Sequence, residues 1–197
     1  MKSERQILLP FRRSLISDLW LCCALAERDI NSAKDALLAS GANPPFIDQP
    51  INFTRPFVEG VIFRMTNDEH KAHLAFTAAR VEQEKIVQAQ PDYGPAWCAL
   101  GVIDAALGRK EEALREGRRA VELLPVEKDA VYGMVMIKYL AMIAAWVGEK
   151  DLACEQLAIA IRPLSDVSYG ELKLMPWWDP LRSDPRFEKI VASLAPK

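Results

Sequence analysis

Apolar residues recur along most of the chain at spacings of three and four, the period of an amphipathic α-helix, whereas the alternation typical of strands is scarce. The pattern predicts a helical hairpin over residues 12–41 that closes at Gly41, because glycine favours helix ends. Residues 42–53 contain three prolines and are expected to form an irregular connection. A second hairpin is predicted over 54–90, with Thr54 as its N-cap and a final helix of about six turns.

The leading helix of each of these hairpins carries an apolar stripe that we expect to be buried. In the first hairpin the stripe consists of Leu15, Ile16, Leu19, Trp20, Cys23 and Ala26. In the second it consists of Phe57, Val58, Val61, Ile62 and Met65.

Fixed offsets appear from Pro91 onward, where two more hairpins are predicted over 92–125 and 129–162. Gly108 and Gly148, the predicted turns, are 40 residues apart, and Pro91 and Pro125 are 34 apart. Offsets of this size are typical of stacked helix–turn–helix repeats. Residues 163–197 are expected to form a C-terminal cap with Asp184 as N-cap ahead of Pro185. The stripe of this cap is Phe187, Ile190, Val191 and Leu194.

The 92–125 hairpin resembles the tetratricopeptide (TPR) repeat. The matching residues are Trp97, Leu100, Gly101, Gly108, Ala113, Ala120 and Pro125. It departs from that pattern at Asp104, where the family has a tyrosine, and at Gly117, where it has an aromatic residue. The stretch 169–187 is similar to the tail that closes the C-terminal TPR regions of many bacterial multidomain regulatory proteins. The resemblance implies an all-α fold: a single TPR-like domain over 1–197, an α-solenoid of about four helical hairpins with a C-terminal capping helix.

The amino-acid composition argues against several classes of protein. The 25 basic and 27 acidic residues nearly cancel, so no charge excess favours nucleic acid or a membrane surface. The apolar run at Ile7–Leu9 is too short for a signal peptide, and the run at 134–147 is too short to cross a bilayer. We therefore expect a cytoplasmic protein. The four cysteines include no CxxC pair and are expected to be buried, reduced thiols.

Few residues suggest a catalytic or metal-binding role. His70 and His73 are three apart on one helix but lack a third metal ligand, so a solvated helix face is the favoured interpretation. The basic run 108–120 is balanced by glutamates, and we expect Glu116 and Arg119 to pair on an exposed face. No glycine-rich phosphate loop or nucleophile motif occurs. We therefore expect no enzyme, no catalytic residue, no metal and no cofactor.

The TPR resemblance implies that the first helix of each repeat lines a concave groove that binds a partner protein. The corresponding residues are Cys98, Val102, Ala105, Lys138, Tyr139, Met142 and Trp146. Residues 163–181 could instead fill this groove. The expected function is an adaptor or scaffold, monomeric or weakly homo-oligomeric, that binds a protein segment.

The 40-residue spacing is closer to that of kinesin light chains, which suggests a bacterial kinesin-light-chain-like protein on a cytoskeletal filament. The alternative is a regulatory or sensor subunit that controls a separate kinase, cyclase or transcription factor.

Overall fold

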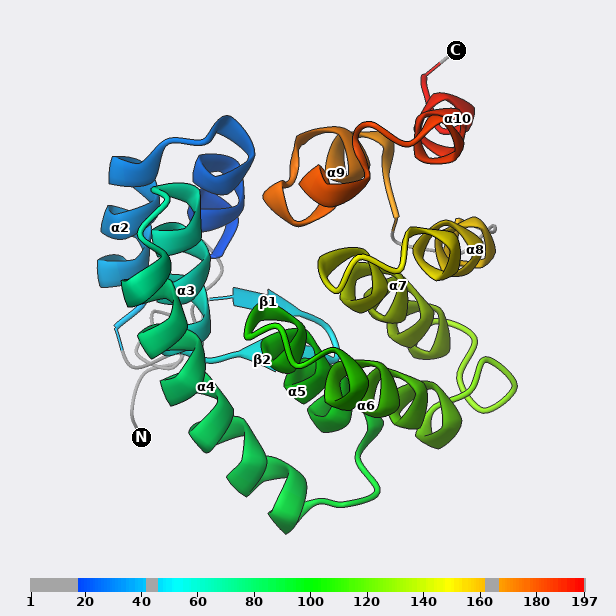
Figure 1. Ribbon diagram of the computed structural model, residues 1–197, viewed down its shortest axis with the longest axis horizontal. Helices are drawn as coiled ribbons and strands as arrows, with labels where there is room; N and C mark the ends of the chain where they lie inside the picture. Colours follow the sequence, from blue (N-terminus) through cyan, green and yellow to red (C-terminus); the bar gives the residue numbers. More distant parts are fainter. Residues whose placement is uncertain (1–17, 42–45, 162–166, 197) are drawn as a thin grey trace, which may run out of the picture. The chain divides into compact units, whose positions relative to one another are not determined.

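The computed structural model describes residues 18–41, 46–161 and 167–196, and helices form most of them (Figure 1). The all-α prediction is therefore confirmed. The irregular connection predicted over 42–53 is wrong in part, because Phe46–Asp48 (β1) and Ile51–Phe53 (β2) pair as a two-stranded sheet. The side chains of β2 alternate between buried and exposed, which suits a half-buried strand.

The described residues divide into two compact units, one formed by residues 18–41, 46–48 and 52–79, the other by residues 49–51, 80–161 and 167–196. The first unit contains helical residues 18–27, α2 (Ile30–Ala39), α3 (Arg55–Met65) and the first half of α4 (Glu69–Ala89). Gly41 follows α2 with φ of +63°, as the predicted helix stop requires. Thr54 occupies the N-cap position of α3, although its side chain makes no capping hydrogen bond.

Three aromatic rings form much of the core of the first unit. Phe53 stacks on Phe57 with 4.3 Å between ring centroids, and Phe57 lies 5.8 Å from Phe76. The stripe predicted on α3 is confirmed at four of its positions and half-buried at Met65. These contacts hold α3 against the first half of α4.

The stripe predicted for the first helix is wrong in the part that the structure describes. Leu19 is 67% exposed, and Cys23 is exposed as well, whereas Leu21 and Leu25 are buried. Both faces of this helix carry apolar side chains, so the periodicity alone does not determine which face packs. Leu15 and Ile16 lie outside the described residues.

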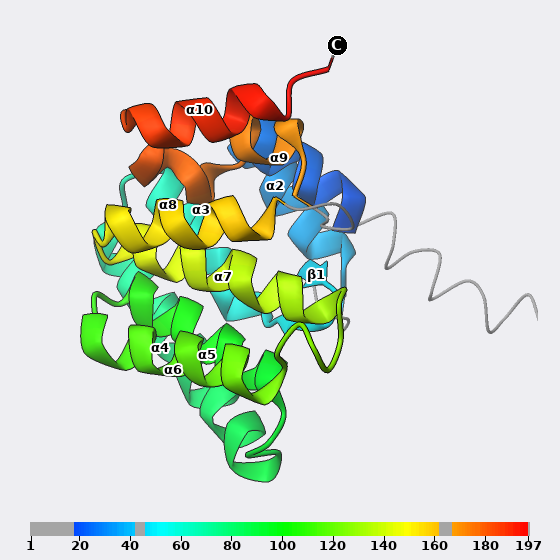
Figure 2. The same cartoon turned by 90° about the vertical axis from the view of Figure 1, so that its right-hand side faces the viewer.

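The second unit is built on two helical hairpins. They are α5 (Gly94–Ala106) with α6 (Lys110–Leu123), and α7 (Tyr132–Trp146) with α8 (Lys150–Ala160). Gly108 and Gly148 form the turns with φ of +75° and +82°, as predicted. Helix α7 begins three residues later than expected because the Asp129 carboxylate accepts hydrogen bonds from the N–H groups of Val131 and Tyr132. Helix α7 packs against α5, α6 and α8, which places the hairpins in successive layers (Figure 2).

The C-terminal residues cover the end of this stack. They form α9 (Tyr169–Leu174), the 3₁₀ helix η1 (Pro176–Leu181) and α10 (Pro185–Ser193), which contacts α8. Asp184 caps α10 by accepting the Arg186 N–H at 2.9 Å, as predicted. The cap is anchored by Trp178 and Phe187, both fully buried. Among the described residues, no helix is both long enough and apolar enough to cross a bilayer.

Candidate functional site

The predicted groove residues lie on α5 and α7, and they are not accessible. Six of the seven are at most 5% exposed, and the seventh, Trp146, is half-buried. Helix α7 is buried around almost its whole circumference, since α5, α6, α8 and η1 all contact it. In this conformation the seven side chains act as packing residues, and their role in partner binding stays a prediction.

The carboxyl end of α7 is covered by the chain's own C-terminal segment. The indole N–H of Trp146 donates a hydrogen bond to the carbonyl of Trp177 in η1 at 2.8 Å. Elsewhere in η1, Trp178 packs on Phe187 with 6.2 Å between ring centroids. Residues 176–181 therefore occupy surface on α7 that the sequence analysis left open to either a partner or this segment.

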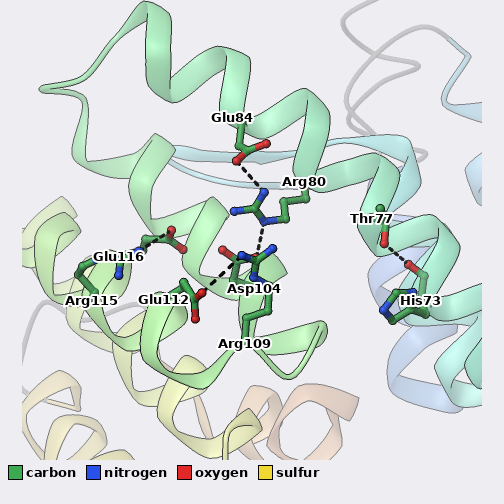
Figure 3. A network of polar contacts seen from close by, with 9 residues as sticks. All are labelled: His73, Thr77, Arg80, Glu84, Asp104, Arg109, Glu112, Arg115 and Glu116. Carbon is green, nitrogen blue, oxygen red and sulfur yellow. Dashed lines mark hydrogen bonds and ion pairs between the residues drawn. The ribbon is translucent and has the colours of Figure 1, made fainter.

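A cluster of charged side chains joins the second half of α4 to the α5–α6 hairpin (Figure 3). Asp104 is fully buried on α5. Its Oδ1 accepts a 2.6 Å hydrogen bond from the Arg80 Nε–H, and the same oxygen lies 3.6 Å from Arg109 Nε. Arg80 also donates to Glu84 at 2.6 Å. These contacts raise the pKa of Arg80, chiefly through its hydrogen bond to Asp104. A buried carboxylate with a directly bonded guanidinium is a compensated charge.

Glu116 on α6 belongs to the same cluster, and the exposed pairing with Arg119 predicted for it is wrong. Glu116 is only 3% exposed, its nearest cation is Arg115 at 3.9 Å, and Arg119 pairs with Glu122 instead. Burial in the first place, and the negative charge of Asp104 in the second, raise the pKa of Glu116 to about 8. The charge pattern of α6 does not reveal that Glu116 is buried, because the burial arises from packing of this face of α6 against α5.

An open pocket of about 300 Å³ lies between α2 and α3 in the first unit. It is lined by Lys34, Leu37, Leu38, Arg55, Glu59, Ile62 and Phe63. This pocket was not predicted from the sequence. The available signal was Leu38, an apolar residue outside the buried positions of α2, which is 74% exposed in the structure.

Arg55 lines the pocket and also bonds to the end of α2. One of its nitrogens, Nη2, donates to the carbonyls of Leu37 and Gly41 at 2.9 Å each, and contacts the Ser40 hydroxyl at 3.3 Å. The last carbonyls of a helix have no backbone partner within it, so the arginine, together with the Ser40 hydroxyl that donates to Leu37, acts as a cap for α2. It thereby fixes the carboxyl end of α2 to the amino end of α3 and gives the pocket a defined rim.

The remaining candidate residues are the histidines and the cysteines. His70 and His73 are exposed, and His73 contributes its backbone carbonyl to the Thr77 hydroxyl at 2.8 Å. Within the described ranges, no three histidine, cysteine or acidic side chains are placed to hold a metal ion. The four cysteines are free, as predicted, but only Cys98 and Cys154 are buried.

Comparison of the chain with protein-family models, curated proteins and solved structures gave no match.

Proposed function

We propose that this protein is a non-enzymatic interaction module, an adaptor or scaffold built from TPR-like hairpins, that binds a segment of a partner protein. The observation that carries the proposal is the open apolar pocket between α2 and α3. An exposed apolar pocket with a charged rim is typical of sites that receive an anchoring side chain from a partner.

The lining of the pocket defines the chemistry of the partner. Leu37, Ile62 and Phe63 offer apolar contacts to one inserted side chain, such as leucine or methionine. Burying such a side chain contributes about 1.5–3 kcal/mol, enough for a binding hot spot. The rim has two cations, Lys34 and Arg55, against one anion, Glu59. We therefore propose a partner segment with an apolar anchor next to a carboxylate.

The packing of the second unit supports the TPR-like part of the proposal. The half-buried Trp97 packs against a buried cluster of Val87, Ala96 and Leu100, so the tryptophan and leucine of the repeat pattern meet α4. A side chain at Gly101 would have its Cβ 3.0 Å from the Ala113 carbonyl oxygen on α6. This close helix approach gives a physical reason for glycine at that position of the pattern.

Site-specific photo-cross-linking tests the proposal. A photoreactive amino acid at position 38, on the pocket rim, should capture a partner that is identified by mass spectrometry. The same amino acid at Leu174 on α9, an exposed leucine far from the pocket in sequence, is the control. The dissociation constant of the purified partner is then measured with Leu38→Glu, Lys34→Glu and Leu174→Glu.

We expect at least a tenfold weaker complex for Leu38→Glu, a smaller loss for Lys34→Glu and no change for Leu174→Glu. Equal affinity in all three variants would overturn the pocket as the binding site. The identity of the partner separates the two functional classes. A filament-forming protein favours the cytoskeletal adaptor, tested directly by co-sedimentation, whereas a kinase, cyclase or transcription factor favours the regulatory subunit.

A further inference from the structure

Two buried carboxyl groups in the α4–α5–α6 cluster each have one oxygen without a hydrogen-bond partner. These oxygens are Oδ2 of Asp104 and Oε2 of Glu116, and the two side chains lie within hydrogen-bonding reach of each other. Two carboxylates cannot hydrogen-bond to each other, because an ionised carboxylate only accepts. Both oxygens are satisfied at once if one of the two groups carries a proton.

The surrounding charges determine which group keeps the proton. Asp104 already receives a short hydrogen bond from a directly bonded cation, Arg80. Glu116 has no such donor, since Arg115 is 3.9 Å away and its side chain is 68% exposed. A buried carboxylate without a bonded cation is costly, and it avoids this cost by taking up a proton.

Arg80 is a second cation that favours the ionised form of Glu116, but its hydrogen bonds go to Asp104 and Glu84. Helix α7 meets this part of α6 through apolar side chains, since Leu140 and Ile143 border Gly117. The charged groups described around the pair are Arg80 and Glu84 from α4, Asp104 from α5, Arg109 from the turn, and Glu112 and Arg115 from α6.

We propose that Glu116 is protonated at neutral pH and donates its hydroxyl hydrogen bond to Oδ2 of Asp104, so that α6 is held to α5 by a proton that mildly alkaline conditions remove. Loss of this proton leaves two adjacent buried negative charges with one directly bonded arginine, which disfavours the packed hairpin. The α5–α6 hairpin is then a pH-sensitive element of the second unit.

The direction of the pH dependence follows from the two states of Glu116. In the unfolded chain its pKa is the ordinary 4.5, whereas in the folded protein it is raised to about 8. Between these values the folded state binds one more proton than the unfolded state, so stability falls as the pH rises. The folding equilibrium constant should decrease by about tenfold for each pH unit through this window and level off above it.

Two measurements on the full chain test the proposal. The side-chain carboxyl carbon of Glu116, assigned by its absence from the Glu116→Gln spectrum, is titrated by NMR. Urea unfolding is followed from pH 5.5 to 9 for the wild type, Glu116→Gln and Glu112→Gln. The Glu116→Gln amide can donate the same hydrogen bond without titrating. Glu112 lies on the same helix near the surface and pairs with Arg109, so it serves as the control.

We expect an NMR midpoint near 8. The free energy of unfolding should depend less on pH in Glu116→Gln than in the wild type, whereas Glu112→Gln should show the same pH dependence as the wild type. A midpoint of 4–5 would overturn the proposal. It would equally fail if Glu116→Gln kept the full pH dependence. Should that variant not fold, the urea unfolding of the wild type decides, because a stability that does not fall between pH 5.5 and 8 would overturn the proposal.

Discussion

The contact between Gly133 and the preceding loop is tight enough to make a sharp prediction. Gly133 is the second residue of α7, and a Cβ added there would lie 2.7 Å from both the nitrogen and the Cα of Val126, and 2.9 Å from the carbonyl carbon of Pro125. All three atoms belong to the backbone, so no side-chain rotation relieves the overlap. Gly133→Ala therefore has to displace either the loop or the first turn of α7.

The magnitude follows from the cost of overpacking. Forcing one methyl group into a closely packed site costs about 1–3 kcal/mol. Replacing glycine by alanine in a helix recovers up to about 1 kcal/mol of conformational entropy. Because the overlapping atoms are backbone, we expect a net destabilisation of about 1–2 kcal/mol, which corresponds to a fall in Tm of about 2–8 °C for a chain of this size.

A matched control isolates the clash. Gly170 is also the second residue of a helix, α9, and also follows a tyrosine, but an added Cβ would meet only the Ser168 hydroxyl oxygen at 4.0 Å. The gain in helix propensity is therefore similar in both variants, and their difference measures the overlap. We expect Gly170→Ala to be neutral or slightly stabilising.

The assay is urea unfolding followed by tryptophan fluorescence. Four of the five tryptophans, Trp97, Trp146, Trp177 and Trp178, belong to the second unit, as both glycines do, so the signal reports chiefly on that unit. A midpoint for Gly133→Ala that equals or exceeds the midpoint for Gly170→Ala, with the same m-value, would refute the reasoning.

Two further predictions concern charge and thiol reactivity. Arg80→Met leaves the buried Asp104 carboxylate without its short hydrogen bond, so we expect a loss of about 3 kcal/mol in urea unfolding, whereas the exposed Arg119→Met should change stability by less than about 0.5 kcal/mol. Cys23 is exposed, whereas burial raises the pKa of its neighbour Cys22 to about 12, so iodoacetamide at pH 8 should modify Cys23 well before Cys22. Peptide mass spectrometry measures both sites, and equal labelling would contradict the second prediction.

Local rules were enough to determine the helices and most of their ends from the sequence. Gly108 and Gly148 adopt positive φ and end α5 and α7, where glycine avoids the steric cost of a Cβ. Asp184 and Pro185 begin α10 as predicted, because a capping carboxylate and a proline in the first turn act within a few residues of each other. These features depend on short-range contacts, so one sequence is sufficient to place them.

Tertiary packing decided which helix faces are covered. The predicted groove residue Met142 is buried because α7 is surrounded by other elements, which its own periodicity does not reveal. Glu116 illustrates the same limit for charge. In the sequence, Glu116 has an arginine three residues away, yet in the structure it is buried against α5 beside Asp104. The exposure and protonation of a side chain depend on residues far away in the sequence, and therefore only the folded arrangement determines them.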